Sequence, residues 1–79
     1  MKLPRDLKGI ELAKLLKKYG YVVTRQTGSH MRLTTTMKGE HHITIPNKPL
    51  KVGMLSAILK DVANHLGKSK KEIIEELFK

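Results

Sequence analysis

The chain has 79 residues and no cysteine, which limits it to one small domain and excludes disulfide bridges and thiolate metal sites. Residues 1–60 hold twelve basic and three acidic side chains, whereas residues 61–79 hold four of each, so the formal net charge of +9 lies in the first part. This charge indicates a polyanionic partner. The apolar runs are too short for a membrane span. We therefore expect a single domain over residues 1–79, located in the cytoplasm.

A first helix is predicted from residue 7 or 9 to residue 19. Its apolar side chains recur at helical spacing: Leu12, Leu15, Leu16 and Tyr19. A basic flank runs beside them, formed by Lys14, Lys17 and Lys18. Gly20 is expected to end the helix, because glycine adopts the left-handed conformation at low cost.

Three antiparallel strands are predicted over residues 21–26, 30–37 and 42–46, with a turn at residues 27–29. Apolar residues fall on odd numbers in the second and third strands, so Leu33 is expected to oppose Ile45 across a loop at residues 38–40. One face of this sheet would be core, with Met31, Leu33, Thr35, Ile43 and Ile45. The other face would be open, with His30, Arg32, Thr34, Thr36, His42 and Thr44.

Residues 47–51 are predicted to form a loop, because two prolines lie close together there. A second helix is expected over residues 52–66, ended by Gly67, with an apolar stripe of Val52, Leu55, Leu59, Val62 and Leu66. Ser69 and Glu72 have the spacing of a capping box for a short last helix. The sequence thus predicts an α+β fold of two layers, in the order α-β-β-β-α with a short C-terminal helix.

The turn sequence Thr-Gly-Ser-His places His30 at the start of a strand, on the open face. A histidine there suits a ribonuclease that needs no metal, since it would deprotonate the ribose 2′-hydroxyl, which then attacks the phosphodiester. Arg25, Arg32 and Lys48 could hold the phosphate. On spacing alone, a solvated strand histidine remains the alternative. His42 is expected roughly 20 Å from His30 along the hairpin, too far for joint catalysis.

The sequence offers little support for a metal site or for a nucleophilic serine. His41 and His42 should point to opposite faces of a strand, so a zinc site is not expected, and neither is any other cofactor. His65 is expected to be exposed or to complement the dipole at the end of its helix. Ser29 and Ser56 lack a serine-histidine-carboxylate arrangement, since Asp6 and Asp61 have no evident histidine partner.

Four segments together resemble the HicA toxin family, the small RNA-cleaving toxins of type II toxin–antitoxin systems. Residues 11–21 resemble its first helix, residues 25–30 its Gly-Ser-His motif, residues 43–46 its third strand, and residues 51–59 the start of its second helix. The resemblance covers about residues 7–66. The chain departs from the family at Met31, where many members carry a second histidine, and after Leu66, where it is more charged.

The resemblance implies a fold similar to the double-stranded-RNA-binding domain. It also implies an endoribonuclease that cleaves mRNA and blocks translation, with His30 as the catalytic residue and an antitoxin of the HicB type as partner. The predicted RNA contacts are Lys14, Lys17, Lys18, Arg25, Ser29, Arg32, Lys48 and Lys51. Two alternatives stay open: a non-catalytic RNA-binding domain of the same fold, and an adaptor whose basic face binds an acidic protein.

Overall fold

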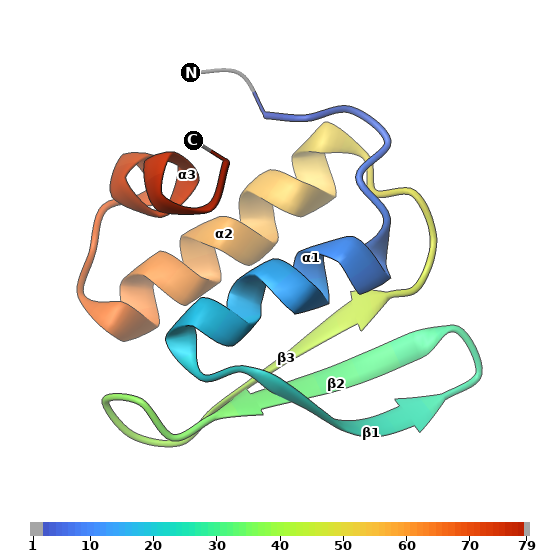
Figure 1. Cartoon of the computed structure of the whole chain (residues 1–79), viewed down its shortest axis with the longest axis horizontal. Helices are drawn as coiled ribbons and strands as arrows, with labels where there is room; N and C mark the ends of the chain where they lie inside the picture. Colours follow the sequence, from blue (N-terminus) through green and yellow to red (C-terminus); the bar gives the residue numbers. More distant parts are fainter. Residues whose placement is uncertain (1–2, 79) are drawn as a thin grey trace.

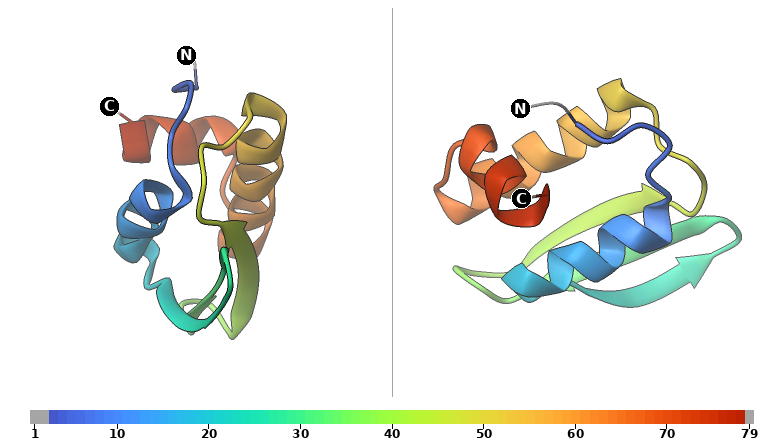
Figure 2. Two further views of the ribbon diagram at one scale, coloured as in Figure 1. Left: turned by 90° about the vertical axis from the view of Figure 1, so that its right-hand side faces the viewer. Right: turned by 45° about the horizontal axis from the view of Figure 1, so that its top comes forward.

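The fold is a three-stranded antiparallel sheet with helices on one face, seen in a computed structural model that describes residues 3–78 (Figure 1). Its elements are α1 (Gly9–Leu16), the 3₁₀ turn η1 (Lys17–Tyr19), β1 (Val22–Thr27), β2 (His30–Thr35), β3 (His41–Pro46), α2 (Val52–Leu66) and α3 (Lys70–Phe78). The strand order is β1-β2-β3, and α3 lies across α2, away from the sheet (Figure 2). The predicted α+β class, similar to a double-stranded-RNA-binding domain, is confirmed.

The first helix begins and ends close to the predicted residues. At its start, the carboxylate of Glu11 accepts a hydrogen bond of 3.0 Å from the backbone N–H of Lys8, which satisfies a donor that the helix leaves unpaired. Its last turn tightens into η1, and Gly20 follows with a φ of 81°. Gly20 therefore ends the helix in the left-handed conformation, as predicted.

The register between β2 and β3 differs from the prediction by two residues. Leu33 opposes Ile43 and Met31 opposes Ile45, so the expected pairing of Leu33 with Ile45 is wrong. Core-facing residues still oppose core-facing residues, as predicted, because the loop over residues 36–40 has an odd length. This loop is five residues long instead of the predicted three. Lys38 and Gly39 both have positive φ in this loop, so the chain turns there through the left-handed region.

Strand β1 carries a β-bulge that the sequence did not indicate. Its pairing with β2 shifts between Val23 and Arg25, so that Arg25 opposes Arg32 and Thr27 opposes His30. All six residues of β1, one of the two edge strands, are exposed. They include two apolar side chains, Val22 at 50 % and Val23 at 44 %.

The core lies between the sheet and the helices. The sheet contributes the residues predicted for its core face, and all are buried: Met31, Leu33, Thr35, Ile43 and Ile45. The only polar member, Thr35, donates a hydrogen bond of 2.7 Å to the carbonyl of Tyr19, which offsets the cost of burying its hydroxyl. The helices contribute mainly Leu12, Leu16, Leu55, Leu59, Val62, Leu66 and Ile73.

The second and third helices follow the prediction with one exception. α2 has the predicted bounds and ends at Gly67, whose φ is 69°, but Val52 is 45 % exposed and does not belong to the apolar stripe. Ser69 and Glu72 form the expected capping box, each accepting from the backbone N–H of the other. Within residues 3–78, no helix is long and apolar enough to cross a membrane.

Candidate functional site

A two-residue turn places His30 on the open face of the sheet. Gly28 has a φ of 58° at the first turn position, which suits a hairpin of type II′, and Thr27 and His30 pair directly across the turn. On its other side His30 pairs with Pro46, at the end of β3. The backbone N–H of Asn47 donates to the carbonyl of Ser29, so the turn is fixed to the loop that follows β3.

Two arginines face each other beside His30. Arg25 and Arg32 are direct cross-strand partners, and Arg32 also pairs with Thr44 of β3. Like charges that oppose each other directly destabilise a sheet, so this pair costs stability unless an anion lies between them. The two-residue turn sets this pairing, because Thr27 opposes His30 and the pairing runs without a shift from there to Arg25.

His30 differs from the other three histidines in its bonding. The rings of His41, His42 and His65 all bond to other protein groups. Within residues 3–78, the ring of His30 has no hydrogen-bond or ion-pair partner, and the residue is exposed. Its imidazole is therefore available to a ligand without the loss of a bond in the protein.

His42 lies on the same face as His30 but is fixed by its neighbours. Its Nδ1 lies 2.7 Å from the hydroxyl of Thr34, and its Nε2 lies 2.9 Å from the carboxylate of Glu40. Thr34, which His42 opposes, is four residues from His30, which corresponds to roughly 13 Å along the strand. The expected separation of roughly 20 Å was wrong because the register was wrong, but the two histidines remain too far apart to act on one phosphodiester.

A second cluster, which the sequence did not predict, lies at the other end of the sheet. His41 Nδ1 bonds the hydroxyl of Tyr21 at 2.7 Å, and His41 Nε2 lies 3.3 Å from a carboxylate oxygen of Asp61. The ring of His65 stacks on that of His41 with 4.3 Å between centroids. Burial and the charge of Asp61 raise the pKa of Tyr21 to about 12.

This cluster corrects one expectation, because Asp61 does have a histidine partner. His65 lies in the last turn of α2, which is the position expected for a residue that complements the dipole. It is half-buried, with its Nε2 at 2.8 Å from the carbonyl of Met37 and 3.1 Å from that of Gly39. The available signal was the spacing of Asp61 and His65, which are four residues apart and therefore share a face of α2. Tyr21 is fully buried, so its hydroxyl holds His41 in place and does not contact a substrate.

The predicted lysine contacts fall into two groups. Lys48 and Lys51 lie on the loop after β3, where together with Pro49 and Met54 they line a cavity of about 350 Å³. Lys14 lies on α1, and Lys17 and Lys18 lie on η1, which belong to the helical layer. Lys18 there donates a hydrogen bond of 2.9 Å to the carbonyl of Glu76. The structure therefore places Arg25, Ser29 and Arg32 beside His30. Lys48 and Lys51 lie on the loop that Asn47 links to the turn before His30, whereas the other three lysines lie in the helical layer.

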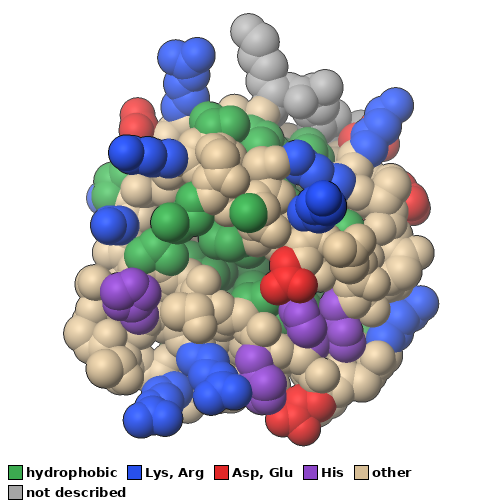
Figure 3. All heavy atoms as spheres, turned by 180° about the vertical axis from the view of Figure 1, so that it is seen from behind, with side chains coloured by type: hydrophobic (Ala, Val, Ile, Leu, Met, Phe, Trp, Pro, Cys, Tyr) green, Lys and Arg blue, Asp and Glu red, His purple; other side chains and the backbone are tan. Residues whose placement is uncertain are grey.

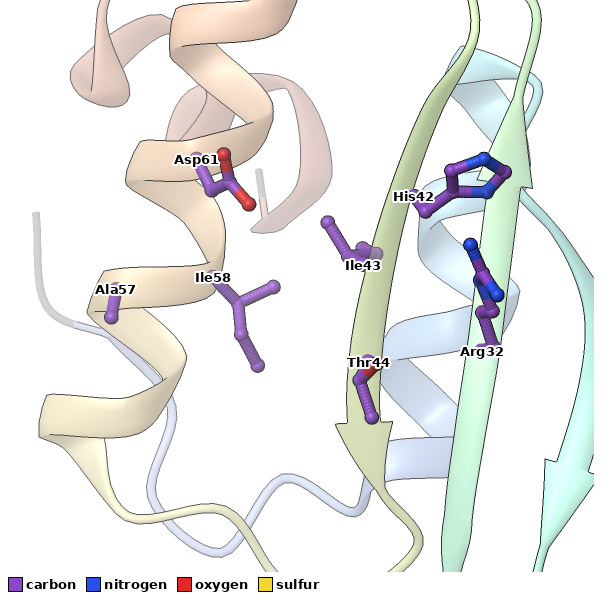
Figure 4. A pocket seen from close by; sticks show the side chains of 7 residues that line it. All are labelled: Arg32, His42, Ile43, Thr44, Ala57, Ile58 and Asp61. Carbon is purple, nitrogen blue, oxygen red and sulfur yellow. The ribbon is translucent and has the colours of Figure 1, made fainter.

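A larger cavity, of about 490 Å³, lies between α2 and the edge of β3 (Figure 4). Its lining residues are Arg32, His42, Ile43, Thr44, Ala57, Ile58 and Asp61. Seen from this side, apolar side chains fill a hollow in the middle of the surface, with basic, acidic and histidine side chains around it (Figure 3). In the part of the chain that the structure describes, no group of three or more histidine, aspartate or glutamate side chains could hold a metal ion.

Comparison with known families assigns the chain to a family. A family model described as "HicA toxin of bacterial toxin-antitoxin" matches residues 9–63, from the first residue of α1 into α2. The chain belongs to the HicA toxin family. No curated protein and no solved structure matches the chain. Membership in the HicA family places the chain in a toxin–antitoxin system, with an antitoxin as its partner.

Proposed function

We propose that this member of the HicA family is a metal-independent endoribonuclease that cleaves mRNA in the cytoplasm and blocks translation. The observation that carries the proposal is the position of His30. Its ring is exposed and has no partner within residues 3–78, and it lies one step along the open face from two opposed arginines. A HicB-type antitoxin would neutralise the toxin by covering this face.

The proposed chemistry needs a base and a phosphate site. His30 removes the proton of a ribose 2′-hydroxyl, and the resulting oxygen attacks the adjacent phosphorus. The bond from phosphorus to the 5′-oxygen of the next nucleotide breaks, and this oxygen takes a proton from water, which leaves a 2′,3′-cyclic phosphate on one product and a 5′-hydroxyl on the other. Arg25 and Arg32 stabilise the charge that develops on the phosphate oxygens in the transition state.

The remaining contacts on this side hold the strand. Ser29 adjoins His30 in the turn, and Lys48 and Lys51 extend the basic surface along the loop after β3. Lys51 also precedes the first turn of α2, where the helix dipole favours a phosphate. A single strand on the open face would not meet Lys14, Lys17 or Lys18, so they contact RNA only where a longer molecule passes around the domain.

The test compares His30→Ala with Asn64→Ala, which removes an exposed polar side chain of α2 that lines neither cavity. Both variants and the wild type are induced from a tightly controlled promoter while growth and mRNA integrity are followed. We expect the wild type and Asn64→Ala to stop growth and degrade mRNA, and His30→Ala to do neither. Purified wild type should cut RNA in the presence of a chelator and leave 2′,3′-cyclic phosphate ends; products with a 3′-hydroxyl would contradict the mechanism.

A second candidate function is favoured by the lysines that lie away from His30. Lys14, Lys17 and Lys18 give the helical layer a basic surface of its own, which suits a duplex read by its shape. A non-catalytic RNA-binding domain would then bind double-stranded RNA with steep salt dependence. Under this alternative, His30→Ala binds RNA as the wild type does, and neither protein cuts it.

A further inference from the structure

The cavity between α2 and β3 combines three kinds of surface (Figure 4). Arg32 provides a fixed positive charge, Asp61 provides a carboxylate on the opposite side, and Ile43 and Ile58 form apolar surface between them. His42 adds an aromatic ring held in place by Thr34 and Glu40. The volume of about 490 Å³ lies within the roughly 300–1,000 Å³ that small-molecule sites have.

The Asp61 carboxylate is a positioned acceptor and not a mobile surface charge. One of its oxygens lies 3.3 Å from Nε2 of His41, and His41 is held in turn by the buried hydroxyl of Tyr21. The ring of His65 stacks on the ring of His41. The side chain of Asp61 is nevertheless 56 % exposed, so the carboxylate can accept hydrogen bonds from a ligand in the cavity.

The cavity begins next to the proposed reaction centre. The pair of Arg32 and Thr44 follows the pair of His30 and Pro46 along the sheet, on the same face, at roughly 7 Å. An RNA strand whose scissile phosphate lies between His30 and Arg32 would therefore present its neighbouring nucleotide to the cavity. The base of that nucleotide would reach the apolar surface and Asp61.

We propose that this cavity is a base-recognition subsite for guanine, with Asp61 as the residue that determines specificity. The inference rests on the proposed ribonuclease function and extends it to the nucleotide beside the cleaved bond. Arg32 contacts the phosphate, the apolar surface and the ring of His42 contact the faces of the base, and the carboxylate of Asp61 accepts from its edge. His41 is a positioning residue, because it acts through Asp61.

Guanine fits the carboxylate better than the other bases for a simple reason. A carboxylate only accepts hydrogen bonds, and guanine offers two adjacent donors, at N1 and at the exocyclic N2. Adenine and cytosine each place an acceptor nitrogen beside their single amino donor, which would face a carboxylate oxygen with unfavourable charge. Uracil has one donor flanked by two carbonyl oxygens. Sites that hydrogen-bond a substrate group discriminate strongly against analogues without it.

Binding of nucleotides to the full chain tests the subsite without any cleavage. Wild type is titrated with the 5′-monophosphates of guanosine, inosine, adenosine and cytidine, and binding is followed by chemical shifts of the cavity residues. We expect guanosine monophosphate to bind about tenfold tighter than the adenosine and cytidine compounds, and inosine monophosphate, which lacks the exocyclic amine, to fall between. Equal affinities, or shifts that avoid the cavity, would overturn the proposal.

Two variants assign the preference to the carboxylate. Asp61→Asn should abolish the advantage of guanosine monophosphate, and Glu75→Gln, which removes a carboxylate from α3 outside the cavity, should retain it. If Asp61→Asn retains the preference, Asp61 is not the specificity determinant. His41→Phe retains the Asp61 carboxylate but removes the ring nitrogen that positions it. The preference for guanosine monophosphate should therefore weaken, while the affinity that all four nucleotides share through their phosphate should stay the same.

Cleavage then separates the two proposals. If wild type cuts RNA and the nucleotide beside the cut is predominantly guanosine, both stand, and Asp61→Asn should lose that bias while it still cuts. If it cuts without a guanosine bias and binds the four nucleotides equally, the subsite is wrong and the nuclease stands. If it never cuts RNA but prefers guanosine monophosphate, the nuclease is wrong and the site for guanine stands.

Discussion

Gly9, the first residue of α1, lies directly against the backbone carbonyl of Pro46, the last residue of β3. A Cβ atom at position 9 would overlap the Pro46 carbonyl oxygen and come within 3.1 Å of the Asn47 Cα. The N–H of Gly9 also donates a hydrogen bond of 3.1 Å to the carbonyl of Lys48. The start of α1 therefore sets the path of the loop that follows β3, and this loop adjoins the turn that carries His30.

We expect Gly9→Ala to destabilise the protein by about 1–3 kcal/mol, because the backbone must move to admit the methyl group. Gly53→Ala is the matched control: Gly53 lies in α2 with open space around its Cα, so alanine there should stabilise by about 0.5–1 kcal/mol. Urea unfolding measures both. Equal stability of the two variants would mean that the contact with Pro46 relaxes freely.

The sequence predicted the elements and the two faces of the sheet because these depend on local pattern. Alternation along β2 and β3 separates Leu33 and Ile43 from Arg32 and Thr44 regardless of how the strands slide in steps of two residues. The register itself was missed, since it depends on the length of the loop over residues 36–40. Pattern alone could not tell a three-residue loop from a five-residue loop.

The candidate site was predicted in part for the same reason. A glycine turn before His30 is a local feature, so its place at the start of β2 was correct. The opposition of Arg25 and Arg32 depends on a turn of two residues where three were predicted, and the cluster of Tyr21, His41 and Asp61 joins three distant segments of the chain. Contacts between distant segments of this kind leave no periodic trace in the sequence.

Removal of one of the two opposed arginines should weaken RNA binding without a loss of folding stability. We expect Arg25→Ala to leave stability unchanged or to raise it by up to about 1 kcal/mol, because it removes a like-charge pair. The same variant should bind RNA more weakly. The slope of the logarithm of its binding constant against the logarithm of the salt concentration should be smaller by about one. Thermal unfolding and RNA binding at several salt concentrations check both; Lys60→Ala, on the exposed face of α2, is the control for charge alone.

The two groups of lysines should differ in their effect on single-stranded RNA. We expect the double variant Lys48→Ala and Lys51→Ala to lose affinity and cleavage, since both lysines lie on the loop that Asn47 links to the turn before His30. The double variant Lys14→Ala and Lys17→Ala removes the same charge from the helical layer and should behave almost as the wild type. Filter binding and cleavage of one labelled oligonucleotide compare them. The reverse order would favour the RNA-binding domain without catalysis.

His65 should stabilise the loop between β2 and β3. Its ring lies within hydrogen-bond distance of the carbonyls of Met37 and Gly39, so His65→Leu should cost about 1–2 kcal/mol and speed amide hydrogen exchange over residues 36–40. Asn64→Ala changes the neighbouring exposed residue of the same helix and is expected to leave the loop protected. Similar exchange in both variants would show that the loop holds without His65.

The attachment of α3 should depend on pH through Glu76. The hydroxyl of Tyr19 donates a hydrogen bond of 2.5 Å to this carboxylate, and Lys68 reaches both of its oxygens. The bond from Tyr19, followed by that from Lys68, lowers the pKa of Glu76 below its ordinary value of 4.5. A lowered carboxylate pKa stabilises the fold above the unfolded value, and this stability is lost as the pH falls through the folded value.

We therefore expect Glu76→Gln to be less stable than the wild type at pH 7, with a difference that shrinks steadily as the pH falls below 4.5. Urea unfolding of both proteins between pH 7 and pH 3 gives this difference directly. Glu75→Gln removes the neighbouring charge of α3 without a bond to Tyr19 and is the matched control. Tyr19→Phe should reproduce part of the loss, because it removes the principal donor; a difference that stays constant with pH would show that the charge of Glu76 contributes nothing.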